Sequence, residues 1–250
     1  ITPVTATQSV AAAILASARA ATLVHSTSPV QRLVGVQVRL GEKAHDRHYQ
    51  RLYAETGWAY YRAAMRHLAR EFGPERVGFV VTAGGSMGSN AADMNEARAH
   101  LSSVGAHVFF SPSEDPHVDL AVLRGCDGLV IGPSTLGWWA AYLAQLPDGR
   151  VIAPRHMLNA ELPETHALVK GFDRLDYYPP SWLLLDNNGT GTLRYAACVW
   201  PSVNETVRSL HLVTATGTSN APERTWLGAI ISSSSSNERY TATAAAVASC

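Results

Sequence analysis

The sequence contains few cysteines and no surplus of either charge. Its three cysteines, Cys126, Cys198 and Cys250, are too few and too widely spaced for a disulfide framework or a CxxC metal site. The 20 basic and 20 acidic side chains give a net charge of zero. Because binding to a nucleic-acid backbone needs a basic surplus, nucleic acid is not an expected partner.

Long hydrophobic runs are also absent. The most apolar stretch, residues 11–24, is interrupted by Arg19 and falls short of the roughly 18 apolar residues that span a membrane. We interpret this stretch as a packed helix, so any membrane anchor is expected in a segment outside this chain. The chain begins at Ile1 rather than at a methionine, and we expect it to be part of a longer product.

Short apolar runs alternate with helical patterns along most of the chain. Hydrophobic residues make up 46% and charged residues 16%, which is typical of a globular protein. The predicted strands are residues 33–38, 77–82, 106–110, 128–132 and 151–154, and the predicted helices are 8–25, 54–71, 91–103, 117–125 and 135–146. Strands separated by helices indicate βαβ units, and therefore an α/β fold with a Rossmann-like parallel sheet.

The composition divides the chain into three parts. Residues 1–30 are expected to form an N-terminal helix and linker, and residues 31–186 the Rossmann-like domain. Residues 187–250 are rich in Ser, Thr, Ala and Asn and are expected to be irregular. In a parallel sheet, ligands bind beyond the carboxyl ends of the strands, so the loops 39–48, 82–90 and 132–137 are expected to lie together.

The loop before the 135–146 helix is the first candidate binding element. A helix N-terminus offers free N–H groups and partial positive charge to a diphosphate, and Ser134 and Thr135 add hydroxyl groups. Gly132 and Gly137 would permit close backbone approach. The alternative is that Ser134 or Thr135 is only a helix N-cap. The loop has neither the GxGxxG nor the GxxxxGK[ST] pattern, so dinucleotide and P-loop sites are not predicted.

Charged residues near the same strand ends supply the remaining candidates. Arg39 ends a predicted strand and would bind a diphosphate or stabilise a leaving nucleoside diphosphate, unless it only pairs with Glu42. Glu42 and Asp46 are candidate general bases, with a solvated loop as the alternative for each. His45, Asp46 and His48 have no third partner fixed by spacing, so no metal site is predicted. Asp119 is either a ligand group or a partner of the helix dipole.

Four segments resemble, in order, the conserved blocks of the galactoside α-1,2-fucosyltransferases, glycosyltransferase family 11. CDGLVIGPSTLGWWAAYLA (126–144) is similar to the block containing Ser-Thr-Phe-Gly-Trp-Trp. VGVQVRLGEK (34–43) resembles the His-x-Arg-Arg-Gly-Asp block. GFVVTAGGSM (78–87) and DYYPPSWLLL (176–185) resemble the middle and closing blocks.

This resemblance implies the nucleotide-binding half of a GT-B glycosyltransferase that transfers L-fucose from GDP-fucose to a terminal galactose of a glycan. Transfer would invert the anomeric carbon and use no metal or other cofactor, and the enzyme would act in the Golgi lumen. Arg39, Ser134 and Thr135 match positions near the diphosphate, and Asp119 matches an acid of the same region. Because a GT-B enzyme has two Rossmann-like domains and fewer than 35 residues precede the first block, most of the acceptor-binding half is expected to be missing.

The first block departs from the family pattern at three positions. Gln37 stands where the family has His, Leu40 where it has the second Arg, and Glu42 where it has Asp. Leu40 cannot bind an anion, and losing one such contact costs on the order of 2–4 kcal/mol in a transition state. A non-catalytic nucleotide-sugar- or glycan-binding module is therefore the alternative function. A third hypothesis, an NAD-dependent oxidoreductase, fits the fold but lacks the glycine fingerprint.

Overall fold

The chain folds around a mostly parallel β-sheet. The computed structural model describes residues 4–21, 30–40, 46–84, 90–105, 107–159 and 177–196. In these residues the sheet has seven strands in the order β3-β2-β1-β4-β5-β6-β7, and all neighbours are parallel except β6 and β7. The strands are β1 (Arg32–Arg39), β2 (Val77–Gly84), β3 (Val108–Phe110), β4 (Gly128–Ile131), β5 (Val151–Pro154), β6 (Leu183–Leu185) and β7 (Arg194–Tyr195). This architecture confirms the predicted Rossmann-like α/β fold.

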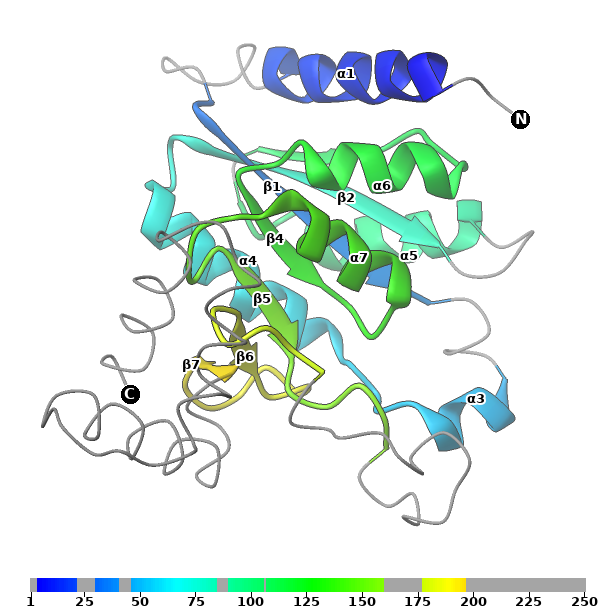
Figure 1. The fold of residues 1–250 in the computed structure, drawn as a ribbon, viewed down its shortest axis with the longest axis vertical. Coiled ribbons are helices and arrows are strands. Elements are labelled where there is room, and N and C mark those ends of the chain that lie inside the picture. The colour runs from blue at the N-terminus through cyan, green and yellow to red at the C-terminus, as the bar shows by residue number, and fades with distance from the viewer. Residues whose placement is uncertain are drawn as a thin grey trace, which may run out of the picture.

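Helices cover both faces of the sheet (Figure 1). α1 (Val4–Ala21), α6 (Pro116–Arg124) and α7 (Thr135–Ala144) pack on one face, and α4 (Trp58–Phe72) and α5 (Asn90–Leu101) on the other. The short helix α3 (Arg47–Leu52) follows β1. Because both faces are covered, the central strands are buried almost throughout, which explains their continuous apolar sequences.

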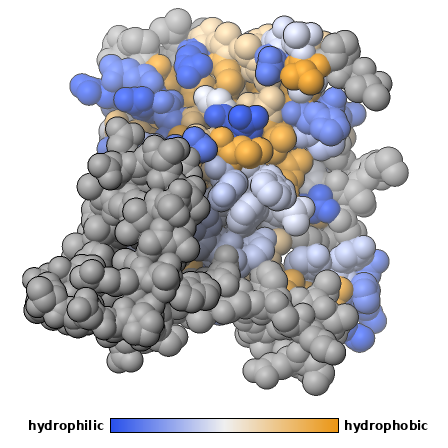
Figure 2. Space-filling view, in the orientation of Figure 1, coloured by the Kyte–Doolittle hydropathy of each residue, from blue (hydrophilic) through white to orange (hydrophobic). Residues whose placement is uncertain are grey.

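The two faces of the sheet carry two hydrophobic cores. Ile14 of α1 and Leu123 of α6 belong to the first core, and Tyr61 and Leu68 of α4 belong to the second. Burying one such side chain contributes roughly 1.5–3 kcal/mol. Figure 2 views the first face from outside and shows hydrophobic residues exposed between hydrophilic ones where α1 and α6 lie. Among the described residues, no helix combines the length and the apolar composition needed to cross a membrane.

The strand order reverses direction between β1 and β4. From β1 the chain proceeds outward to β2 and β3, then returns to β4 on the other side of β1 and proceeds outward to β5 and β6. In open α/β sheets, this topological switch point leaves a crevice beyond the carboxyl ends of the two central strands. The crevice here lies beyond Arg39 of β1 and Ile131 of β4.

Helix α4 fixes one wall of this crevice. The hydroxyl of its buried Tyr60 donates to the main-chain oxygens of Ile131 (2.8 Å) and Ile152 (3.1 Å), so the helix is anchored to β4 and β5. The helix ends at Gly73, whose φ of +89° lies in the region that favours glycine. The helix predicted over 54–71 was wrong at its start, because α4 begins at Trp58 and residues 54–57 form a loop before it.

Three further details differ from the sequence-based expectations. The sheet does not end at residues 151–154, because β6 and β7 extend it, and β7 lies in the segment expected to be irregular. The helix α3 was not predicted. The first helix begins at Val4 rather than at residue 8, and it packs through Ala11, Ile14 and Ala18 while Val10 is exposed.

Candidate functional site

The carboxyl ends of β1 and β2 and the first residues of α6 and α7 enclose a small cavity at the switch point. Its volume is about 160 Å³, and we call it the α7 cavity because the first residues of α7 form one wall. It is lined by residues from the ends of two strands and the starts of two helices, including Gln37, Arg39, Thr82, Asp119, Ser134 and Leu136. Four of the residues singled out in the sequence, Gln37, Arg39, Asp119 and Ser134, are therefore brought together.

Ser134 occupies the N-cap position of α7 without making the capping hydrogen bond. Its backbone is extended (φ −143°, ψ 135°), its side chain is buried, and no side-chain bond to the helix is formed. Ser134 therefore stands at the N-cap position that the alternative interpretation gave it, but its hydroxyl does not make the bond through which a cap residue stabilises a helix. The unused hydroxyl and the free N–H groups of the first turn make this end of α7 suited to an anion.

Thr135 is the first residue of α7 but is exposed and does not line the α7 cavity. Although Thr135 follows Ser134 directly, its side chain lies outside the α7 cavity. The structure therefore separates the two hydroxyl groups that the sequence had treated as a pair.

Gln37 is buried and connects β1 to the loop before α7. The backbone N–H of Gly132 donates to the Gln37 main-chain oxygen (3.0 Å) and to its side-chain Oε1 (3.3 Å). A Cβ atom at Gly137 would lie 2.7 Å from Oε1, and one at Gly132 would overlap the Tyr61 hydroxyl. Both glycines therefore make room for protein side chains, which is a different reason from the ligand approach expected in the sequence.

Asp119 and Thr82 supply buried polar atoms to the α7 cavity. Asp119 Oδ1 and Thr82 Oγ1 are shielded from solvent and have no hydrogen-bond partner among the described residues. Burial raises the pKa of Asp119 to about 7, although a hydrogen bond with Ser113 acts to lower it and the nearby Asp115 raises it further. Buried polar groups without partners are rare in folded proteins, so this pair favours a ligand that hydrogen-bonds to them.

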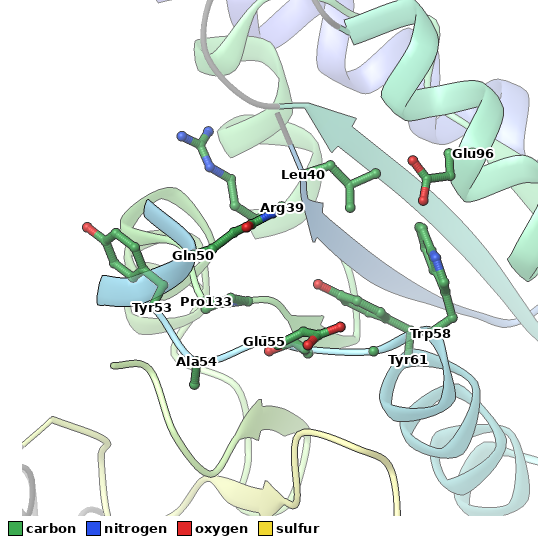
Figure 3. Close-up of a pocket in the computed structure, with 12 residues that line it drawn as sticks. Arg39, Leu40, Gln50, Tyr53, Ala54, Glu55, Trp58, Tyr61, Glu96 and Pro133 are labelled. Carbon is green, nitrogen blue, oxygen red and sulfur yellow. The ribbon is translucent and has the colours of Figure 1, made fainter. Parts of the chain in front are cut away.

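A second and larger cavity opens on the other side of β1. Its volume is about 390 Å³, and we call it the α4 cavity because residues at the start of α4 form one wall. Among its lining residues are Arg39, Tyr53, Glu55, Trp58, Tyr61 and Glu96. In Figure 3, the Tyr61 hydroxyl and the Glu55 carboxylate extend toward the middle of the cavity. Arg39 lines both cavities, so the two meet at the end of β1.

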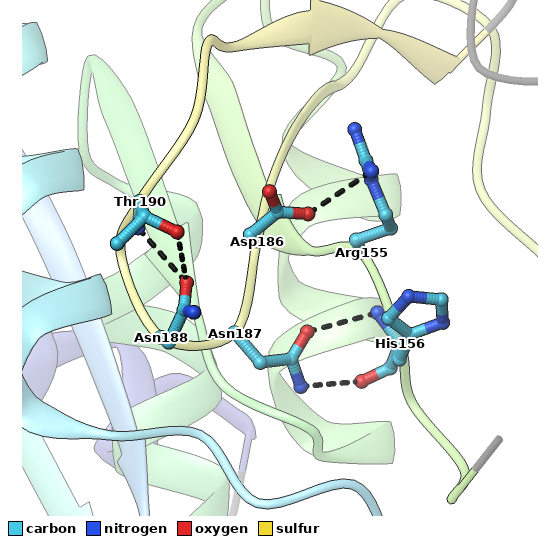
Figure 4. A network of polar contacts seen from close by, with 6 residues as sticks. All are labelled: Arg155, His156, Asp186, Asn187, Asn188 and Thr190. Atoms are coloured by element: carbon cyan, nitrogen blue, oxygen red, sulfur yellow. Dashed lines mark hydrogen bonds and ion pairs between the residues drawn. The ribbon is translucent and has the colours of Figure 1, made fainter.

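Asn187 holds the rim of the α4 cavity in place. Its side-chain amide donates to the main-chain oxygen of Glu55 (3.1 Å), to Thr56 Oγ1 (3.1 Å) and to the main-chain oxygen of His156 (2.9 Å). Its Oδ1 accepts from the His156 N–H at 3.0 Å, as Figure 4 shows. The Gly57 N–H donates to the Asn187 main-chain oxygen. The segment 55–57 is therefore fixed to the residues that follow β5 and β6.

Of the two candidate general bases, Asp46 does not join this arrangement. Asp46 is the N-cap of α3, where its carboxylate accepts from the His48 N–H at 2.7 Å, and it lines neither cavity. The solvated, structural interpretation therefore describes Asp46 better than a catalytic role. Glu42 and His45 lie outside the described residues.

Sequence reasoning missed Thr82, Tyr61, Glu55 and Asn187. Thr82 had a signal, because it is the polar residue near the end of an otherwise apolar strand. Tyr61 lies inside the helix predicted over 54–71, and the helical pattern gives no indication that its hydroxyl reaches a strand end. Glu55 and Asn187 lie in segments whose positions depend on long-range contacts.

Comparison with known proteins identifies the family of the chain. A search of curated proteins finds no match. Glycosyl transferase family 11 matches residues 8–171, which is more than half of the chain and includes both cavities. The matched range contains β1 to β5 and the helices α6 and α7 that border the switch point. The chain belongs to glycosyl transferase family 11, the fucosyltransferase family.

Proposed function

We propose that this protein transfers L-fucose from GDP-fucose to a terminal galactose of a glycan, with inversion at the anomeric carbon and without a metal ion. Family 11 membership already implies a nucleotide-sugar donor and a glycan acceptor. The observation that carries the finer proposal is the α7 cavity. There Arg39 and Ser134, whose hydroxyl makes no capping hydrogen bond, border one enclosed space at the switch point.

In the proposed reaction the diphosphate of the donor lies against the N-terminus of α7. Arg39, the N–H groups of the first turn and the Ser134 hydroxyl would stabilise the negative charge that develops on the leaving GDP. The galactose hydroxyl oxygen attacks the anomeric carbon of fucose, the bond from that carbon to the phosphate oxygen breaks, and GDP leaves with the electron pair. The hydroxyl proton is released to solvent water or to the departing diphosphate. Asp119 and Thr82 would hydrogen-bond to the nucleotide.

Calorimetry with GDP and GDP-fucose tests this proposal. We expect both to bind, and we expect Arg39→Ala and Ser134→Ala to weaken binding by about tenfold or more, because each removes a contact to the diphosphate. Arg62→Ala is a matched control, since Arg62 lies on α4 and lines neither cavity. Failure of GDP to bind, under conditions where an active fucosyltransferase binds it, would exclude the proposal.

A second candidate function, a non-catalytic GDP-sugar-binding module, is favoured by Leu40. This side chain packs against the hydrophobic core of the α4 face and lines the α4 cavity, where the family pattern has a second Arg. GDP-fucose binding without transfer to a galactoside and without donor hydrolysis would select this function. Gain of transfer in Leu40→Arg would show that the missing charge is the cause.

The proposed setting is the Golgi lumen, with membrane attachment through a segment outside this chain. Both follow from the family and are proposals for this protein.

A further inference from the structure

The α4 cavity has the size and the lining of a second binding site beside the α7 cavity. At about 390 Å³ it falls within the size range of small-molecule sites, roughly 300–1,000 Å³. Arg39 is the one described residue that lines both this cavity and the α7 cavity. A ligand here would therefore lie next to the diphosphate end of a donor bound at α7.

The charges of the α4 cavity disfavour a phosphate group. Glu55 and Glu96 place two carboxylates in its lining, against the single guanidinium of Arg39. A diphosphate would meet like charges at short range, which costs free energy. The same carboxylates are strong acceptors for hydroxyl groups of an uncharged ligand.

Tyr61 offers a buried hydroxyl to this cavity. The residue is 1% exposed, and the described residues provide no acceptor for its hydroxyl proton. Burial raises the pKa of Tyr61, while the backbone N–H of Arg39 acts to lower it, so the hydroxyl keeps its proton at neutral pH. A ligand hydroxyl within reach would accept this proton in a hydrogen bond.

The aromatic walls fit a non-planar ring better than a nucleobase. The Trp58 and Tyr61 rings are 5.8 Å apart and inclined at 45°, and one face of Trp58 is covered by the stacked His100 ring, 4.6 Å away. Two inclined rings do not form the parallel slot in which a flat base stacks. Apolar ring surfaces beside carboxylates and a hydroxyl are suited to the C–H and O–H groups of a sugar.

We infer that the α4 cavity is a pyranose subsite that holds the terminal galactose of the acceptor. The inference rests on the proposed function for the identity of the sugar, but the chemistry of the site stands on the residues above. The Asn187 hydrogen bonds that fix residues 55–57 hold Glu55 at the rim before any ligand binds. Such prior ordering reduces the entropy that binding must overcome.

Nuclear magnetic resonance titration tests the inference with methyl β-D-galactopyranoside, GDP and GDP-fucose as separate probes. The variants are Glu55→Gln and Tyr61→Phe in the α4 cavity, Ser134→Ala in the α7 cavity, and Glu71→Gln as a control. Glu71 is exposed on α4 and lines neither cavity. Glu55 is exposed, so its replacement by the isosteric Gln should leave the fold intact.

We expect Glu55→Gln and Tyr61→Phe to weaken galactoside binding by about five- to tenfold and to change GDP affinity by less than about twofold. Ser134→Ala should show the reverse pattern, and Glu71→Gln should change neither affinity.

Three results would overturn the inference. They are absence of galactoside binding to the parent chain, equal galactoside affinity in the parent and both α4-cavity variants, and a loss confined to GDP-fucose, which would assign the cavity to the donor sugar. Because the galactoside is titrated without nucleotide, its affinities for the parent chain and the variants are measured independently of whether GDP binds.

Discussion

The backbone N–H of Gly132 donates to both oxygens of Gln37, at 3.0 Å to the main-chain oxygen and 3.3 Å to Oε1. This pair connects the end of β1, which carries Arg39, to the loop that leads into Ser134 and α7. The two elements proposed to hold the diphosphate are therefore fixed relative to each other in the absence of ligand. The hydrogen bonds favour a site that is formed before the donor arrives.

Gln37→Ala is expected to weaken GDP binding by about three- to tenfold, because the loop before α7 loses its side-chain anchor. Unfolding should become easier by roughly 0.5–1.5 kcal/mol, since the main-chain bond remains. Calorimetry and urea denaturation measure the two effects. Gln31→Ala is the matched control, because Gln31 is exposed and lines neither cavity. Equal GDP affinity in the two variants would refute the anchoring role.

Gly132→Ala is expected to destabilise the protein by about 1–3 kcal/mol, because its Cβ would overlap the Tyr61 hydroxyl in a packed region. Tyr61→Phe removes that oxygen, so the double variant should recover part of the loss. A double-mutant cycle by urea denaturation measures this coupling. Recovery should be incomplete, because the Gln37 main-chain oxygen would also lie 3.1 Å from the new carbon. Strict additivity would show that Tyr61 and Gly132 do not constrain each other.

The stability of the protein should fall between about pH 4 and pH 7 through Asp119. Burial raises the pKa of this carboxyl from 3.8 to about 7, so the folded state holds a proton that the unfolded state has released in this range. Since the folded state binds more protons there, raising the pH favours unfolding. Urea denaturation at pH 5 and pH 7.5 should show a smaller decrease in stability for Asp119→Asn than for the parent. The same decrease in both would argue against an elevated pKa.

Asn188 is expected to carry an N-linked glycan if the protein is made in a secretory compartment. The sequon Asn188-Gly189-Thr190 lies in a turn between β6 and β7, and both Asn188 and Thr190 are exposed. The Asn188 Oδ1 accepts from the Thr190 N–H (3.0 Å) and hydroxyl (2.6 Å) in the folded turn, as Figure 4 shows.

Expression in a secretory host, in an Asn204→Gln background that removes the other sequon, tests this expectation. Glycosidase treatment should increase electrophoretic mobility, and Thr190→Ala should abolish the shift while Thr190→Ser retains it. A protein without glycan in that host would show that the turn at Asn188 is not used as a glycosylation site.

The parts of the fold predicted from the sequence are those with strong local patterns. The buried runs around Val36 and Val130 and the helix around Met65 have periodicities that need no distant partner. β6 and β7 have three and two residues, and a pattern so short does not distinguish a strand from a loop. They form because β5 offers an edge for pairing, which is information that the local sequence does not contain.

The candidate site was predictable to the extent that parallel topology determines it. Arg39 and Ser134 follow neighbouring strands, so the fold alone brings them to one edge of the sheet. The position of Asp46 was not predictable in this way, because α3 was not recognised and an N-cap role depends on that helix. Tyr61 lines the α4 cavity because its side chain points toward the end of β1, and helical periodicity does not predict that direction.

Arg39 forms part of the wall of both cavities, and this has a thermodynamic consequence. A donor diphosphate at α7 would attract the guanidinium and so change the surface that a sugar meets in the α4 cavity. Two ligands that share one side chain influence each other's affinity reciprocally. The affinity of the protein for each ligand should therefore change by the same factor when the other ligand is bound.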